Sequence, residues 1–87
     1  MNFTVIWAPT GRRLLASVVT TTADRNAVTR AANYIDRLLM LDPLHEGKPY
    51  RRGYRKLFVT PLTVEYSVDV RNHIVKMVHV EEGDTTP

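Results

Sequence analysis

The chain has 87 residues, of which 44% are hydrophobic and 24% charged, with a formal net charge of +3 and no cysteine. A chain this short buries only about 60–65% of its unfolded surface, which excludes two independent cores and predicts a single domain over residues 1–87. The absence of cysteine excludes disulfides and thiolate metal sites, and we expect a cytoplasmic protein without a cofactor. Because no apolar run reaches the length of a signal sequence or a membrane span, we expect neither secretion nor membrane insertion.

The first predicted element is a strand over residues 3–7, where β-branched and aromatic residues form a short run that ends before Pro9. A helix is predicted next, with Thr10 as its N-terminal cap. The apolar residues of this helix recur at helical spacing and form one stripe: Leu14, Leu15, Val18 and Val19. The β-branched residues that follow are expected to fray its end.

A second and stronger helix is predicted after residues 20–24, which offer several capping side chains. Asp42 and Pro43 are expected to end it, because the residue before a proline avoids the helical conformation. Its apolar residues lie on one face: Val28, Ala31, Ala32, Ile35, Leu38 and Leu39.

Residues 43–53 contain two prolines and two glycines and are predicted to form a loop. Beyond them the hydrophobic period changes to two, and three strands are predicted over residues 54–59, 62–69 and 74–80. In the middle one, Thr63, Glu65, Ser67 and Asp69 are expected to face solvent.

The predicted order is β-α-α-β-β-β, an α+β fold in which two N-terminal helices pack on a mostly antiparallel four-stranded sheet. The ordered core is expected to cover about residues 2–81, with a polar tail at 82–87. The sheet face opposite the helices is expected to be free for binding.

The most distinctive local feature is a basic segment between residues 48 and 56. It holds five of the twelve Lys and Arg residues, two tyrosines and no acidic residue. Guanidinium groups bind phosphate oxygens and tyrosines stack on unpaired bases, so the segment suits single-stranded RNA or a ribosomal surface. A solvated basic loop is the alternative interpretation. The basic members are Lys48, Arg51, Arg52, Arg55 and Lys56.

The three histidines lie in different predicted elements, and neither a zinc-protease motif nor a glycine-rich phosphate loop is present, so no metal site is predicted. His79 could exchange protons near neutral pH, or it could be an ordinary packed or surface residue. We expect it to point outward, with Ile74, Val78, Val80 and the snorkelling Lys76 facing the core.

Glu65 is a carboxylate flanked by apolar residues on the predicted wet face of its strand. It could act as a general base, or it could pair with a cross-strand Lys or Arg. Pairing is the interpretation we favour.

Four stretches of the sequence carry a resemblance to a known family: Tyr34–Leu39 running into Asp42–Pro43, Gly47, Gly53–Leu57, and Pro61–Val68. With them the chain resembles, from Phe3 to Val80, the RelE/ParE toxin superfamily of bacterial type II toxin–antitoxin systems. The resemblance implies the same β-α-α-β-β-β fold and a cognate antitoxin, which would lay a partly disordered acidic segment across the toxin.

Members of this superfamily either cut mRNA in the ribosomal A site or inhibit DNA gyrase, and the fold does not decide between these activities. We expect the RelE-like activity first, in which the RNA 2′-hydroxyl attacks the adjacent phosphate with help from basic side chains. The resemblance then implies catalytic roles for Lys56 and Arg55, and His79 is a further catalytic candidate because it could exchange protons near neutral pH. It also implies RNA contacts from Arg51 and Arg52, to which the composition of the basic segment adds Lys48 and Tyr54.

Two departures from the interferase pattern keep the alternative open. Thr63 stands where many members carry a catalytic arginine. His79 is followed by Glu81 and Glu82, whose negative charge would repel phosphate. The alternative is a ParE-like gyrase inhibitor or a non-catalytic protein with the toxin fold.

Overall fold

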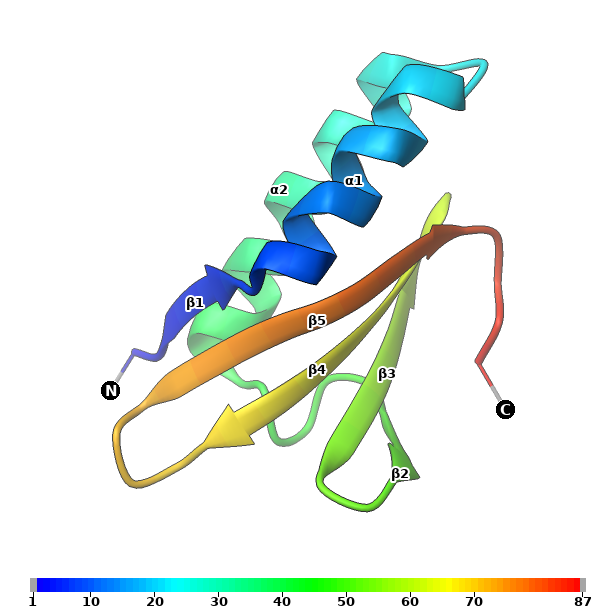
Figure 1. The fold of residues 1–87 in the computed structure, drawn as a ribbon. Coiled ribbons are helices and arrows are strands. Elements are labelled where there is room, and N and C mark those ends of the chain that lie inside the picture. The colour runs from blue at the N-terminus through cyan, green and yellow to red at the C-terminus, as the bar shows by residue number, and fades with distance from the viewer. Residues whose placement is uncertain (1, 87) are drawn as a thin grey trace.

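The computed structural model describes residues 2–86. Its elements are β1 (Thr4–Trp7), α1 (Pro9–Thr21), α2 (Arg25–Leu41), β2 (Lys48–Arg51), β3 (Tyr54–Val59), β4 (Leu62–Asp69) and β5 (Ile74–Glu82). The strands form one sheet in the order β1-β5-β4-β3-β2, with β1 parallel to β5 and the other pairs antiparallel (Figure 1). The predicted α+β fold is confirmed, but the sheet has five strands instead of four.

The additional strand is β2, which lies within the segment predicted to be a loop. It pairs with β3 through Lys48 opposite Lys56 and Pro49 opposite Arg55, and the register then shifts before Arg51. All four of its residues are exposed. Pro49 is tolerated because an edge strand has one side without ladder hydrogen bonds. A four-residue polar strand that contains proline gives almost no period-two signal, which explains why the sequence does not reveal it.

The helix boundaries test the predicted capping residues. β1 ends before Pro9, as predicted, and Pro9 is itself the first residue of α1, because its fixed φ and missing N–H suit the first helical turn. The N-cap of α1 is Ala8, which makes no side-chain cap, so the prediction of Thr10 is wrong. The N-cap of α2 is Asp24, one of the predicted capping residues, and its carboxylate accepts a hydrogen bond of 3.0 Å from the Ala27 N–H. This helix ends at Leu41, immediately before Asp42, as predicted.

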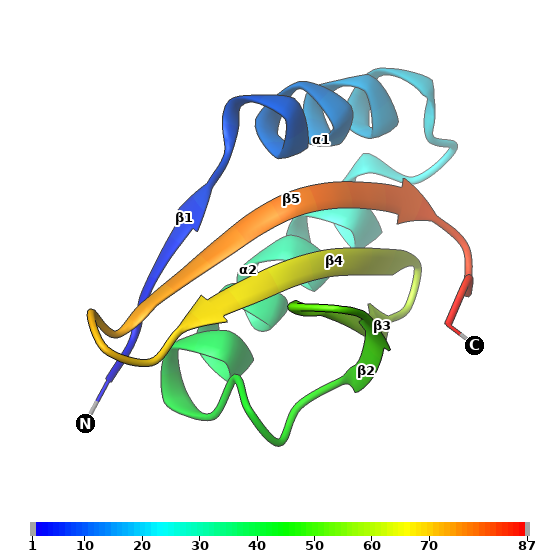
Figure 2. The same cartoon turned by 60° about the horizontal axis from the view of Figure 1, so that its bottom comes forward.

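Both helices pack on one face of the sheet, with α1 against β5 and α2 against β1, β3 and β4. Figure 2 shows α2 crossing behind the central strands. Gly11 allows the close approach of α1, because a Cβ at that position would lie 2.6 Å from the Met77 carbonyl oxygen. The buried apolar side chains include Val28, Ile35 and Leu39 of α2, Leu62, Val64 and Tyr66 of β4, and Val75, Met77 and Val80 of β5.

The side of the sheet that each β5 residue faces is set by an irregularity at Val78. Met77 pairs with Tyr66 while His79 pairs with Glu65, so Val78 is an extra residue without a partner on β4. A bulge of this kind lets Met77 and Val80 both reach the helix side, although their spacing is odd.

The predicted orientation of β5 is therefore only half correct. The expectation that Lys76, Ile74 and Val78 face the core is wrong, since Lys76 is exposed and the other two are only half-buried. Val80 is buried, and His79 lies on the outer face, as predicted.

Among residues 2–86 no helix is long and apolar enough to cross a membrane.

Candidate nucleic-acid interface

The sheet face turned away from the helices carries four ionisable residues in register, which we call the charged row. Lys48 of β2 pairs with Lys56 of β3, Lys56 pairs with Glu65 of β4, and Glu65 pairs with His79 of β5. Directly opposed residues of paired strands point to the same face. With strands about 4.8 Å apart, the row extends over roughly 14 Å. One carboxylate thus lies among two ammonium groups and an imidazole.

The carboxylate of the charged row is neutralised by an arginine from the sheet edge. Glu65 Oε2 accepts hydrogen bonds from Arg51 Nε at 3.0 Å and Nη2 at 2.5 Å. The Glu65 side chain is 8% exposed and that of Arg51 58%. The hydrogen bond to Glu65 raises the pKa of Arg51, and the guanidinium carbon lies 4.2 Å from the centroid of the Tyr54 ring. The predicted pairing of Glu65 is confirmed, with a partner two strands away.

Lys56 is covered and not open to solvent. Its residue is only 8% exposed. Its Nζ lies 4.1 Å from the centroid of the Tyr50 ring and donates to Thr85 O at 3.3 Å and Thr85 Oγ1 at 3.4 Å. The expectation that the outer face is free is therefore wrong at this position.

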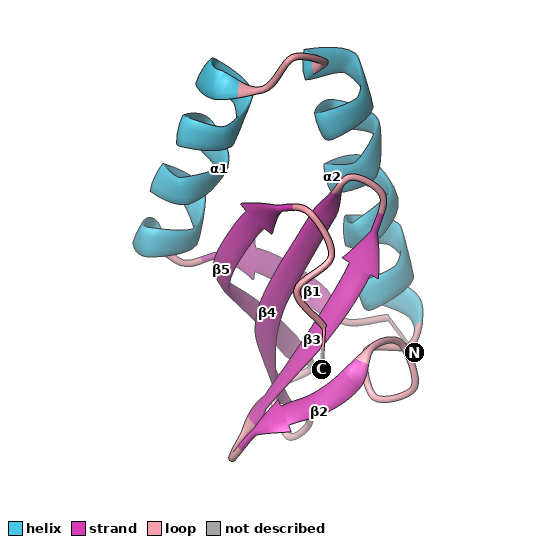
Figure 3. Cartoon of the chain, turned by 90° about the vertical axis from the view of Figure 1, so that its right-hand side faces the viewer, coloured by secondary structure: helices cyan, strands magenta, loops and turns pink. Residues whose placement is uncertain are grey.

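The cover over the outer face is the segment Gly83–Thr86, which we call the strap. It turns back after β5 and passes over the sheet (Figure 3). Thr63 Oγ1 donates to Gly83 O at 2.5 Å and accepts from the Thr85 N–H at 3.1 Å, and the Gly83 N–H donates to Pro61 O at 2.7 Å.

These contacts correct two predictions. Thr63 and Glu65, expected to face solvent, are 1% and 6% exposed. The ordered structure continues past residue 81, the predicted end of the core, because β5 extends to Glu82 and the strap packs on the sheet.

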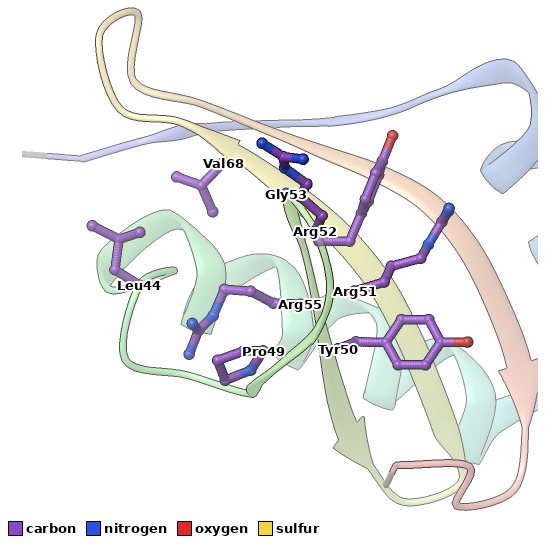
Figure 4. Close-up of a pocket in the computed structure, with 9 residues that line it drawn as sticks. Leu44, Pro49, Tyr50, Arg51, Arg52, Gly53, Arg55 and Val68 are labelled. Atoms are coloured by element: carbon purple, nitrogen blue, oxygen red, sulfur yellow. The ribbon is translucent and has the colours of Figure 1, made fainter.

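Arg55 lies on the opposite face from Lys56. Its Nη2 donates to Gly47 O at 3.0 Å and to Glu46 O at 3.3 Å, in the loop that follows α2. In Figure 4 Arg55 extends toward Leu44 and Pro49, whereas Arg51 and Tyr50 extend to the other side of the hairpin. The structure therefore does not bring Arg55 together with Lys56.

Tyr66 of β4 also contacts the loop that follows α2. Its hydroxyl group lies 2.8 Å from Pro43 O and 2.6 Å from Glu46 O, and its residue is fully buried. Burial raises the pKa of Tyr66, and the nearby Arg55 opposes this shift.

The remaining predicted site residues lie around the β2–β3 hairpin and the end of β5. Lys48 and Arg52 are exposed. Arg52 and Tyr54 line a groove of about 520 Å³ together with Leu44, Pro49, Tyr50, Arg51, Gly53, Arg55 and Val68 (Figure 4). His79 Nε2 lies 3.5 Å from Glu81 Oε1, and both side chains are half-exposed.

Sequence reasoning did not identify Tyr50 as a site residue or the strap as a contact of Lys56. Tyr50 was visible as an aromatic residue within the basic segment, but its position over Lys56 follows from the pairing of β2 with β3.

No protein-family model matches the chain, and no curated protein matches it either. Similar solved structures include a chain of the toxin–antitoxin complex RelBE2 from Mycobacterium tuberculosis, with a TM-score of 0.79, 22% identity, and coverage of 94% of this chain and 99% of that chain. A chain of the chromosomal ParDE toxin–antitoxin system from P. aeruginosa matches with a TM-score of 0.64 and 13% identity. That match covers 94% of this chain and 97% of the other chain. TrmO from Pseudomonas aeruginosa matches with a TM-score of 0.61 and 19% identity, but the match covers 92% of this chain and only 35% of the TrmO chain.

At these identities the comparisons establish the fold. The chain is a small α+β protein with two helices on one face of a mixed sheet and a charged row on the other. Its fold is that of the RelE/ParE toxins, as the resemblance in sequence implied.

Proposed function

We propose that the protein is the toxin of a type II toxin–antitoxin system, of the RelE type, that stops translation by cutting mRNA on the ribosome. The observation that carries this proposal is the charged row, which places Lys48, Lys56 and His79 on one sheet face. The likeness to chains of the RelBE2 and ParDE complexes supports a toxin neutralised by a cognate antitoxin.

The RNA strand would run across the outer face with a phosphate over Lys56. In the cleavage step the 2′-oxygen forms a bond to phosphorus and the bond from phosphorus to the 5′-oxygen breaks. The products are a 2′,3′-cyclic phosphate and a 5′-hydroxyl group. His79, which is half-exposed, is our candidate to accept the 2′-hydroxyl proton. Lys56 is our candidate to stabilise the phosphate oxygens and to protonate the leaving 5′-oxygen.

The ion pair between Arg51 and Glu65 is part of this proposal. An isolated carboxylate between Lys56 and His79 would repel phosphate, and the two hydrogen bonds from Arg51 to Glu65 Oε2 offset that charge. Arg51 is still more than half exposed, so it can also contact the RNA backbone. Arg52 and Tyr54 of the β2–β3 hairpin would contact the flanking nucleotides.

A second candidate is a ParE-like gyrase inhibitor or a non-catalytic binding protein. It is favoured by Thr63, which stands where the RelE pattern has an arginine and is fully engaged with the strap. The carboxylate of Glu81 beside His79 also lowers the positive potential at the end of the row.

Purified protein added to translating ribosomes, with a parallel assay of gyrase supercoiling, separates the two candidates. We expect cut mRNA and unaffected gyrase. Lys56→Ala and His79→Ala should each reduce the cleavage rate by roughly 10²-fold, the usual effect of losing one charge-stabilising or proton-transferring group. Arg30→Ala, which removes an exposed charge from α2, is the matched control and should cut at the normal rate. Inhibited supercoiling with intact mRNA would reverse the assignment.

A further inference from the structure

The strap places peptide groups where a nucleic-acid ligand of the charged row would have to lie. The Lys56 ammonium group donates hydrogen bonds to the carbonyl and hydroxyl oxygens of Thr85. Thr63, in the strand beside Lys56, holds the strap through two further hydrogen bonds. Hydrogen bonds that Lys56 would donate to phosphate oxygens are thus already donated to oxygen atoms of the chain itself.

Asp84 of the strap places a negative charge near Lys48, at the β2 end of the charged row. Asp84 is hydrogen-bonded by the hydroxyl and N–H groups of Thr86, and these bonds, with a smaller contribution from Lys48, lower the pKa of Asp84. The carboxylate therefore stays ionised within the field of a cation that would otherwise attract a phosphate group.

Three features of the strap favour its release from the sheet. Gly83 has a φ of 105° and a Cβ there would meet nothing within 4 Å, so this residue can act as a hinge. Residues 83–85 are exposed. Hydrogen bonds hold the strap to the sheet, and water can replace them more easily than a buried apolar contact.

We infer that Gly83–Thr86 is an autoinhibitory strap that occupies the binding position of single-stranded RNA on the outer face, so that RNA reaches Lys56 only after the strap lifts. The inference rests on the proposed function, since it concerns the same face and the same ligand. A site that is open only part of the time binds with an affinity reduced by the open fraction. Releasing the strap should therefore tighten RNA binding without any new contact.

The test compares the affinities of strap variants for a short fluorescein-labelled single-stranded RNA by fluorescence anisotropy. Truncation after Glu82 removes the strap. Thr85→Pro keeps every charge but removes the N–H that donates to Thr63 and the hydroxyl near Lys56. Both should bind roughly tenfold more tightly than the full chain. Asp84→Asn is the control for the charge lost on truncation, and its affinity should rise less than about twofold.

Thermal melting of each variant checks that it folds, and Lys56→Ala in the truncated chain should abolish the gain. Equal affinities of the full chain, the truncation and Thr85→Pro would overturn the strap while leaving RNA binding in place. If Asp84→Asn tightened RNA binding as much as the truncation does, loss of one negative charge would explain the gain, and the inference of an autoinhibitory strap would also be overturned. Absence of RNA binding in every form would refute the proposed function itself.

Discussion

The two faces of β3 and β4 use their polar residues in opposite ways. On the helix side, Arg55 and Tyr66 direct their polar groups to carbonyl oxygens of the loop that joins α2 to β2. On the outer side, Lys56 and Glu65 belong to a row of ionisable residues whose contacts are made by exposed groups from the sheet edge and the strap. Residues adjacent in sequence therefore belong to different parts of the molecule.

The contacts of Arg55 and Lys56 show which of these positively charged side chains can exchange its present partners for a ligand. The guanidinium group of Arg55 is held by two backbone carbonyls of the protein's own loop. The ammonium group of Lys56 is held by hydrogen bonds of 3.3 and 3.4 Å and by the face of Tyr50, all from segments at the periphery. We therefore expect mutations on the helix side to change stability and mutations on the outer side to change ligand binding.

The largest effect on stability is expected at Tyr66. Replacing this fully buried residue with Ala should lower the free energy of unfolding by about 3–5 kcal/mol, as for other large aromatic truncations. Tyr66→Phe keeps the ring but removes the hydroxyl group that contacts Pro43 O and Glu46 O, of which Glu46 O still accepts from Arg55, and should cost about 1–3 kcal/mol. Urea denaturation measures both values. RNA affinity of the Phe variant should be unchanged, and a loss of binding without a loss of stability would contradict the division between the faces.

A smaller effect is expected from Arg55, and it sharpens the comparison because Lys56 is its neighbour. Arg55→Ala should lower the free energy of unfolding by about 1–3 kcal/mol, because Glu46 and Gly47 lose a donor. Its RNA affinity should change no more than that of Arg30→Ala.

Lys56→Ala should do the reverse. RNA affinity should fall by roughly tenfold and the slope of its salt dependence by about 1, as for one lost phosphate contact. Titrations at several salt concentrations, together with urea denaturation, measure both effects. Equal loss of RNA binding in the Arg55 and Lys56 variants would show that the two cations act together after all.

The parts of the fold that sequence reasoning predicted correctly are those with a strong local signal. The apolar stripe of α2, its cap at Asp24 and its end before Pro43 are each determined by residues close together in the chain. The strict alternation along β4 likewise fixes which side chains face the helices. The parts that were wrong depend on distant partners: β2 on its pairing with β3, the phase of β5 on the bulge at Val78, and the strap on Thr63.

The candidate site shows the same limit. The basic segment stood out in the sequence. Its composition alone did not separate Arg55, which holds the loop after α2, from Lys56, which belongs to the charged row. The separation of Arg55 from Lys56 was in fact predictable, because adjacent residues of a strand point to opposite faces. The pairing of Glu65 with Arg51 instead of Lys56, and the cover over Lys56, required knowledge of how β2 and the strap fold back.

The smallest expected effect concerns Asp36, a charged residue on the helix side. Trp7 Nε1 donates to its Oδ1 at 3.3 Å, which joins β1 to α2. Burial raises the pKa of Asp36, and the Trp7 hydrogen bond opposes the shift. Because the folded state holds this proton more tightly than the unfolded state, the ionised carboxylate lowers the free energy of unfolding at neutral pH. That loss disappears as the pH falls through the folded pKa toward the unfolded value.

Asp36→Asn should therefore be more stable than the wild type at neutral pH, and its advantage should shrink on acidification, because the amide oxygen still accepts from Trp7 and carries no charge. Asp69→Asn is the matched control of opposite sign, since hydrogen bonds from Asn72 lower the pKa of Asp69. It should be less stable than the wild type at neutral pH, and its deficit should close as the pH falls through the range between the folded and unfolded pKa values. Urea denaturation of the three proteins at neutral and acidic pH measures both differences. An Asp36→Asn variant that is less stable than the wild type at neutral pH would mean that this carboxylate stabilises the fold as an ion.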